Sequence, residues 1–260
     1  MAATSAADGA TRRKLFCTRT FCSFVSAISV TNADSERRPA HASQDFLRAG
    51  HALYNSYNGV WMSVNRKKVL RLTERYGGDW AIQHAQRLIR LVEIIGEGME
   101  YDSEAIWLAA HMHDWGTLPG FCRPGVAHCD RSRELAEDFL RQAKCPPDLM
   151  IKILEAIEFH HGGADGHCNE AVLLHDADAL DGIGVMGVLR EFAMIPTEGH
   201  LPYPLPVGIG MAGAYERAKI RMENNPRILR LPKARRIARR RVQEMRLVFK
   251  AFESESLGTI

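Results

Sequence analysis

Residues 101–117 read YDSEAIWLAAHMHDWGT, and this stretch predicts one short helix that ends on an acid–imidazole pair. Acidic residues at Asp102 and Glu104 mark its start, and Gly116 suits its end. Between them the apolar side chains recur at helical spacing. His113 falls on the same face as those apolar side chains. The stretch therefore predicts a helix whose buried face carries an imidazole.

The same helical period continues along the chain in both directions. The further helices expected from it cover about 80–95, 131–143, 149–160, 170–192, 211–223 and 232–253. Gly182, Gly184 and Gly187 fall inside the expected 170–192 helix, where we expect them to permit close helix packing. No segment alternates with period two for long enough to indicate a sheet. The pattern predicts an all-α fold, a helical bundle.

The size and composition of the chain suit a globular protein. The chain has 260 residues, 46% of them hydrophobic and 25% charged, which excludes disordered and fibrous classes. No run approaches the roughly 18 apolar residues needed to cross a bilayer. We expect a poorly ordered leader over 1–43, a single domain over 44–253 and a flexible tail over 254–260. The basic and apolar residues at 11–30 vaguely resemble a targeting signal, so a targeting role for the leader stays open.

The cysteines do not form a recognisable framework. Six are scattered along the chain and no two stand at CxxC spacing, so we expect no structural zinc knuckle. A chain of this length does not depend on disulfides for its stability. We expect reduced thiols in a cytosol-like compartment, and therefore a cytoplasmic protein.

Histidines and aspartates gather on the faces that should point inward. His84, His113 and His160 lie on apolar stripes of three separate expected helices, where a buried imidazole needs a hydrogen-bond partner or a metal. One such histidine is ordinarily a satisfied core residue. Three of them, with an adjacent Asp114 and the Asp176-Ala177-Asp178 run downstream, share an explanation if they converge on a divalent cation. Imidazole and carboxylate ligands without thiolate suit manganese, magnesium, cobalt or iron.

The order of these residues resembles the HD-domain metal-dependent phosphohydrolases. His84-Ala85-Gln86-Arg87 is similar to the H-x-x-R start of the family's first ligand helix, and His113-Asp114 supplies the HD pair. Residues 174–190, LHDADALDGIGVMGVLR, are similar to the family's DAD-x-LD-x-x-G segment. Arg230-Leu231-Pro232 followed by a basic helix resembles the bacterial subgroup proposed to act as nucleotide pyrophosphatases. The resemblance covers about 65–252.

The resemblance implies a ligand set and a reaction. The metal ligands that it implies are His84, His113, Asp114 and Asp178. Asp176 stays as the alternative to Asp178, with capping or a salt bridge as its ordinary role. A bound divalent ion would activate water and polarise a phosphoryl oxygen. Asp114 and His113 would be the catalytic residues, with Asp114 orienting or deprotonating that water.

Three further histidines raise the question of a second metal. His128 stands before the helix expected at 131–143, and His160-His161 end the next one, as in HD relatives that hold two metals. However, the 14 positions from Asp114 to His128 are few for those groups, and glycines follow His161 where the phosphodiesterases have glutamate. Alternatively these histidines line the pocket of a mononuclear site.

Positive charge for substrate phosphate must come from outside the HD motif. No lysine follows Asp114, so Arg87, Arg131 and Arg190 are the candidates for phosphate contact, each of which could equally form an ordinary ion pair. The segment 227–250 carries ten Lys or Arg and one acid, a local charge of +9. We interpret it as a core-docked helix with a basic outer surface, and expect neither a nucleic-acid nor a membrane partner. The oligomeric state is not legible in the sequence.

The sequence thus predicts a metal-dependent phosphohydrolase acting on a small phosphorylated compound, a nucleotide being the preferred class. Two alternatives remain open. One is a di-iron oxygenase on the same scaffold, which would hold two irons through His128 and His160. The other is a regulatory or binding module without catalysis, which the presence of all four core ligands disfavours.

Overall fold

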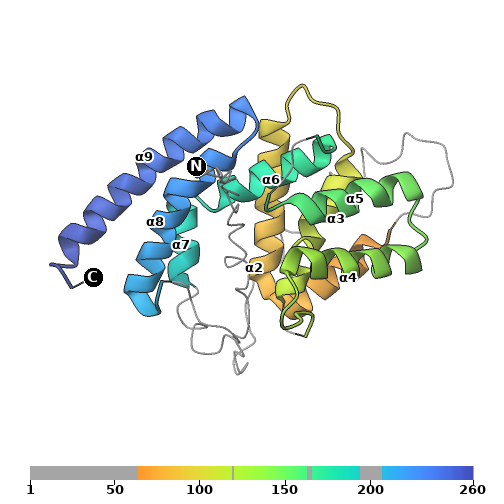
Figure 1. Cartoon of the computed structure of the whole chain (residues 1–260), viewed down its shortest axis with the longest axis horizontal. Helices are drawn as coiled ribbons and strands as arrows, with labels where there is room; N and C mark the ends of the chain where they lie inside the picture. The colour runs from red at the N-terminus through yellow and green to blue at the C-terminus, as the bar shows by residue number, and fades with distance from the viewer. Residues whose placement is uncertain (1–63, 119, 163–165, 194–206, 260) are drawn as a thin grey trace, which may run out of the picture.

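The computed structural model describes residues 64–118, 120–162, 166–193 and 207–259, and these contain helices and no strand (Figure 1). The all-α prediction is confirmed. The helices are α2 (Arg66–Ile95), α3 (Ser103–Met112), the 3-10 helix η1 (Trp115–Thr117), α4 (His128–Gln142), α5 (Pro147–Phe159), α6 (Asn169–Asp181), α7 (Val185–Ala193), α8 (Gly210–Ile228) and α9 (Pro232–Glu255). The predicted leader at 1–43 lies outside the described residues.

Helix α3 is the centre of the bundle. Its N-terminus is capped by Asp102, whose carboxylate accepts hydrogen bonds from the amides of Glu104 and Ala105 at 3.0 and 3.1 Å. The helix packs against α2 on one side and α5 on the other, and most of its residues are buried. It ends at Met112, so that His113 and Asp114 leave the helix inside the protein rather than at its surface.

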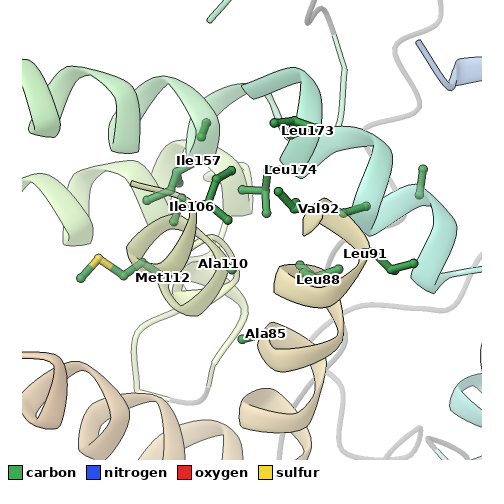
Figure 2. Close-up of a cluster of buried hydrophobic side chains, with 14 of the residues drawn as sticks. Ala85, Leu88, Leu91, Val92, Ile106, Ala110, Met112, Ile157, Leu173 and Leu174 are labelled. Atoms are coloured by element: carbon green, nitrogen blue, oxygen red, sulfur yellow. The ribbon is translucent and has the colours of Figure 1, made fainter. Parts of the chain in front are cut away.

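The hydrophobic core joins α2, α3, α5 and α6 (Figure 2). Leu88, Ile106, Ile157 and Leu174, one from each helix, are all at most 2% exposed. Burying a side chain of this size contributes about 1.5–3 kcal/mol relative to leaving it in water. Because His84 lies one turn before Leu88 on α2, this core also fixes the helix that carries the first histidine.

The expected 170–192 helix is two helices. Helix α6 ends at Asp181 and α7 begins at Val185, with a turn at Gly182–Gly184 between them. Gly184 has φ of +89°, a conformation that glycine adopts without strain. A Cβ atom at Gly187 would lie 2.3 Å from the carbonyl oxygen of Gly182, which is too close to tolerate. The prediction of one continuous helix was wrong because two of these glycines form a turn instead of a packing surface.

Two smaller differences concern helix boundaries. His128 is the first residue of α4 and not part of the loop before it. Helix α2 starts at Arg66, well before the expected residue 80, and contains a kink at Gly78, where φ is +63°. The kink joins two helical segments, and only the second carries His84.

Helix α9 lies along one edge of the molecule, next to α8 (Figure 1). It buries Ala234, Ala238, Met245 and Phe249 and exposes most of its arginines, as expected for a core-docked basic helix. None of the helices described is both long enough and apolar enough to span a lipid bilayer. The four cysteines among the described residues are unpaired.

Candidate metal centre

His84 faces the interior from the middle of α2. Its side chain is 2% exposed, and Nδ1 lies 2.8 Å from Oδ2 of Asp181. Because an ionised carboxylate can only accept, Nδ1 carries the proton and Nε2 keeps its lone pair. That Nε2 lies 3.3 Å from Nε2 of His113 and 3.3 Å from Oδ1 of Asp178.

His113 is held in the same manner at the end of α3. Its Nδ1 donates to the carbonyl oxygen of Ala110 at 3.0 Å, which leaves Nε2 free to act as a ligand. That Nε2 lies 3.3 Å from Oδ2 of Asp114, the next residue. Asp114 Oδ2 is also 3.8 Å from Nε2 of His84. The end of α3 therefore directs one imidazole nitrogen and one carboxylate oxygen to the same point.

The structure brings together all four residues that the family resemblance suggested as ligands. Two imidazole nitrogens face two carboxylates, and the ligand atoms of His84, His113 and Asp114 lie within 4.8 Å of one another. The ligand atoms of His113, His160 and Asp178 likewise lie within 4.8 Å of one another. Two imidazoles, each neutral once an ion has displaced any proton from its Nε2, and two carboxylates are a donor set that fits a divalent cation. The described residues thus contain clusters able to hold a metal ion.

We call the four suggested ligands, His84, His113, Asp114 and Asp178, the first cluster. A second cluster, made of Asp114, His128, His160 and His161, lies on the other side of Asp114. His128 and His160 place their Nε2 atoms 3.3 Å apart, and these lie 4.0 and 3.9 Å from Oδ1 of Asp114. His160 Nδ1 donates to the carbonyl oxygen of Ile157 at 2.5 Å, so its Nε2 also keeps a lone pair. His161 completes the group and approaches Oδ2 of Asp178, at 3.7 Å. Asp114 offers one oxygen to each cluster.

The charges of the cluster are set by burial and by the neighbouring groups. Burial raises the pKa of Asp114, but the charge of His113 and its hydrogen bond outweigh burial and hold that pKa well below its ordinary value. Burial likewise lowers the pKa of His113, and Asp114 outweighs it, raising that pKa to about 9. The pKa of His128 falls to about 3, chiefly through burial and the charge of His161. At neutral pH His128 is a neutral imidazole, the form that binds metal.

Asp176 points away from both clusters. Its carboxylate accepts hydrogen bonds from the backbone amides of Arg230 and Leu231, at 2.8 and 2.7 Å, just before the first turn of α9. This is a capping role of the kind expected for Asp176 if it is not a ligand. Asp178, two positions later on α6, faces His84 instead. The geometry favours Asp178 over Asp176 as the ligand.

The three candidate arginines are all engaged in ion pairs. Arg87 and Arg190 both bind Asp181, with their shortest contacts at 2.7 and 2.8 Å, so they lie beside the residue that holds His84. Arg131 donates to Glu134 and to the carbonyl oxygen of Phe121, at 2.9 Å each. Phosphate contact by these arginines stays a prediction, and Arg87 and Arg190 are the two tied to a residue of the first cluster.

Two features of this site were not anticipated. No role was predicted for Asp181, the last aspartate of the DAD-x-LD segment, yet it binds His84 and two arginines, and its place one turn after Asp178 was the available signal. The indole of Trp80 stacks on the His84 ring, with centroids 5.5 Å apart, and the guanidinium of Arg190 lies 5.1 Å from the Trp80 ring. Trp80, His84, His113 and Asp114 line one side of a pocket next to the first cluster.

Comparison with known proteins agrees with the family resemblance of the sequence. Residues 81–183, which include all four suggested ligands, match the HD domain family. The chain is 30% identical over 134 residues to YpgQ, an uncharacterised protein of Bacillus subtilis, and the match covers 49% of this chain and 62% of YpgQ. The match thus spans less than two thirds of the length of this relative.

Solved structures show the same fold. A crystal structure of Bacillus subtilis YpgQ in complex with ADP is similar with a TM-score of 0.56 at 22% identity, covering 75% of this chain and 99% of that one. A structure described as an HD-superfamily hydrolase from Bacillus thuringiensis is similar with a TM-score of 0.52 at 20% identity, covering 74% and 94%.

The chain is thus an all-α protein whose residues 81–183 match the HD domain family, with a histidine- and aspartate-rich centre between its helices. Among the proteins to which it is similar is YpgQ of Bacillus subtilis.

Proposed function

We propose that this protein is a divalent-metal-dependent phosphohydrolase that acts on a nucleotide. One observation carries the proposal, namely the convergence of His84, His113, Asp114 and Asp178 from three segments distant in the chain. Burying four such polar groups side by side is costly unless a cation compensates for their lost hydration. An ion held by these residues would supply a water of lowered pKa and would polarise a phosphoryl oxygen.

The protein's own groups have separate tasks in this proposal. Asp114, a quarter exposed, has an oxygen on the side of His128 and His160, where it can accept a hydrogen bond from the attacking water and orient it toward phosphorus. His128 is uncharged at neutral pH, and its Nε2, 4.0 Å from the same oxygen of Asp114, can accept a second hydrogen bond from that water. Arg87 and Arg190 have N–H groups beyond those bound to Asp181, and in this proposal these bind the substrate phosphate.

The nucleotide class is supported by a relative. YpgQ of Bacillus subtilis, which shares the fold, has been crystallised in complex with ADP. Arg87 and Arg190, which lie beside the first cluster, suit the phosphate groups of such a ligand.

The proposal is tested by measuring phosphate and pyrophosphate release from a panel of nucleotides after metal removal and addition of Mn²⁺, Mg²⁺ or Co²⁺. The wild-type protein should release product, whereas a variant with His113→Ala and Asp114→Ala should lose both hydrolysis and metal binding while keeping its helical circular dichroism. His167→Ala is the control, because His167 pairs with Glu155 outside both clusters. A fully active double variant would contradict the proposal.

A second candidate follows from the second cluster. Asp114, His128, His160 and His161 could hold another ion next to the first, the arrangement required by a di-iron oxygenase on the HD scaffold. Elemental analysis of protein purified without added metal separates the candidates. Two equivalents of iron with oxygen consumption and no phosphate release would favour the oxygenase, and product release with Mn²⁺ would favour the phosphohydrolase.

A further inference from the structure

Asp181 is a buried carboxylate at the end of α6 that lies outside the proposed ligand set. It is 1% exposed and accepts hydrogen bonds from three side chains on two other helices. His84 Nδ1 lies 2.8 Å from its Oδ2, Arg87 Nε lies 2.7 Å from its Oδ1, and Arg190 Nη1 lies 2.8 Å from its Oδ2. Such a concentration of donors on one carboxylate restrains all three side chains.

The contact with His84 decides which ring nitrogen can bind a metal. A carboxylate has no proton to donate, so the proton of a neutral His84 must be on Nδ1 and the lone pair on Nε2, which faces His113 and Asp178. The ring is also held from its face by Trp80, which in turn lies against the Arg190 guanidinium. Asp181 thus contacts His84 directly and, through Arg190, supports the ring that stacks on it.

We propose, as an extension of the proposed function, that Asp181 is a positioning residue that fixes the tautomer and orientation of His84 for metal binding and ties Arg87 and Arg190 to the same point. Asp181 then contacts both a proposed metal ligand, His84, and the two arginines proposed to bind the substrate phosphate. The chain does this with a single residue because Asp181 follows Asp178 by one helical turn and so lies on the same side of α6.

The test compares Mn²⁺ binding by the metal-free wild-type protein and the Asp181→Asn variant, measured without substrate by the electron paramagnetic resonance signal of the free ion. An asparagine can turn its NH₂ toward His84, which would then accept at Nδ1 and carry its proton on Nε2. We expect the affinity for Mn²⁺ to fall roughly 10–100-fold, the usual range for loss of a group that orients a ligand. The visible spectrum of the Co²⁺ form should change as well, because it reports the coordination geometry.

Glu191→Gln is the matched control. Glu191 is also buried and also bound by two arginines, Arg217 and Arg221, but it has no contact with a histidine of either cluster. This variant should lose stability and keep the wild-type Mn²⁺ affinity and Co²⁺ spectrum. Asp181→Glu provides a second variant that preserves the charge facing the arginines, and its longer side chain should also weaken Mn²⁺ binding.

Different results overturn different statements. If the wild-type protein binds Mn²⁺ and both Asp181 variants bind it equally well with an unchanged Co²⁺ spectrum, the positioning role is wrong and the proposed function stands. If Glu191→Gln weakens Mn²⁺ binding as much as Asp181→Asn does, the effect is general destabilisation and the inference is again wrong. If the wild-type protein binds no divalent ion, the proposed function itself fails.

Discussion

Three histidines of this site each donate from Nδ1 to a group that can only accept a hydrogen bond. Asp181 accepts from His84, the Ala110 carbonyl from His113 and the Ile157 carbonyl from His160. In each pair the acceptor fixes the proton of the neutral ring on Nδ1, so that Nε2 is the nitrogen that faces the cluster as a potential ligand. The two carbonyls lie three residues before their histidines, at the ends of α3 and α5. Helix ends thus supply acceptors that the middle of a helix could not.

Substitution by alanine should have different effects at Asp178 and at Asp176. Asp178→Ala removes an oxygen 3.3 Å from His84 Nε2 and should abolish Mn²⁺ binding with little change in folding. Asp176→Ala leaves two partly buried amides before α9 without their acceptor and should cost about 1–3 kcal/mol of stability, with Mn²⁺ binding kept. Chemical denaturation of both variants measures their stability, and Mn²⁺ titration measures their metal binding. The reverse pattern would make Asp176 the ligand.

Metal binding should depend on pH through His113. The pKa of this histidine is about 9 in the metal-free protein, so at pH 7 its Nε2 carries a proton that an incoming ion must displace. Raising the pH removes the competing proton, and we expect the Mn²⁺ affinity to rise from pH 6.5 to 8.5 and to level off above about 9. Calorimetry in two buffers of different ionisation enthalpy should detect about one proton released at pH 7.5. An affinity independent of pH over this range would contradict the prediction.

Among the elements, α6 connects the site to the rest of the protein. Asp178 and Asp181, one turn apart, face the first cluster, while Asp176 on the other side caps the entry to α9. The helix is buried on nearly all sides, so both sides can carry polar groups only because each group has partners. The turn at Gly182–Gly184 then brings Arg190 on α7 back to Asp181.

Helices η1 and α4 pack closely against each other at the site. A Cβ atom at Gly116 would lie 2.4 Å from the carbonyl oxygen of His128, and the Gly116 amide donates to Ser132 Oγ at 2.8 Å. Gly116→Ala should therefore push the start of α4 outward, cost about 1–3 kcal/mol of stability and weaken binding by the cluster that contains His128.

Gly162→Ala is the control for Gly116→Ala. Gly162 directly follows His161, a histidine of the second cluster, but a Cβ atom there would meet nothing within 4 Å. Denaturation midpoints and the number of Mn²⁺ ions bound per chain are the measurements. If Gly116→Ala matches the wild-type protein in both, the contact with α4 does not control the position of His128.

For the molecule as a whole, the site and the core depend on the same helices. His84 precedes Leu88 on α2, and His113 follows the buried Met112 at the end of α3, so the packing in Figure 2 also sets the distances between the histidines. A preformed cluster of this kind exists only in the folded chain. Metal binding should consequently stabilise the entire protein and not only the site.

The expected result is a rise in Tm when Mn²⁺ is added. At 100 times the dissociation constant, one bound ion adds about 2.7 kcal/mol, which corresponds to roughly 5–10 °C for a chain of this size. The shift should be reversed by EDTA and absent in Asp178→Ala. Scanning calorimetry with and without Mn²⁺ measures it, and an equal shift in Asp178→Ala would place the ion elsewhere.

Helical period and residue type are local properties, so the helical fold, most of the helices and the histidines and aspartates of the interior can be predicted from the sequence. The carboxylate of the 176–181 segment that faces the cluster could not be predicted in this way, since α6 is buried on nearly all sides and its apolar pattern marks no inward face. The sharing of Asp114 between two clusters and the anchoring of His84 by Asp181 likewise depend on contacts between residues 14 to 97 positions apart, which no local pattern encodes.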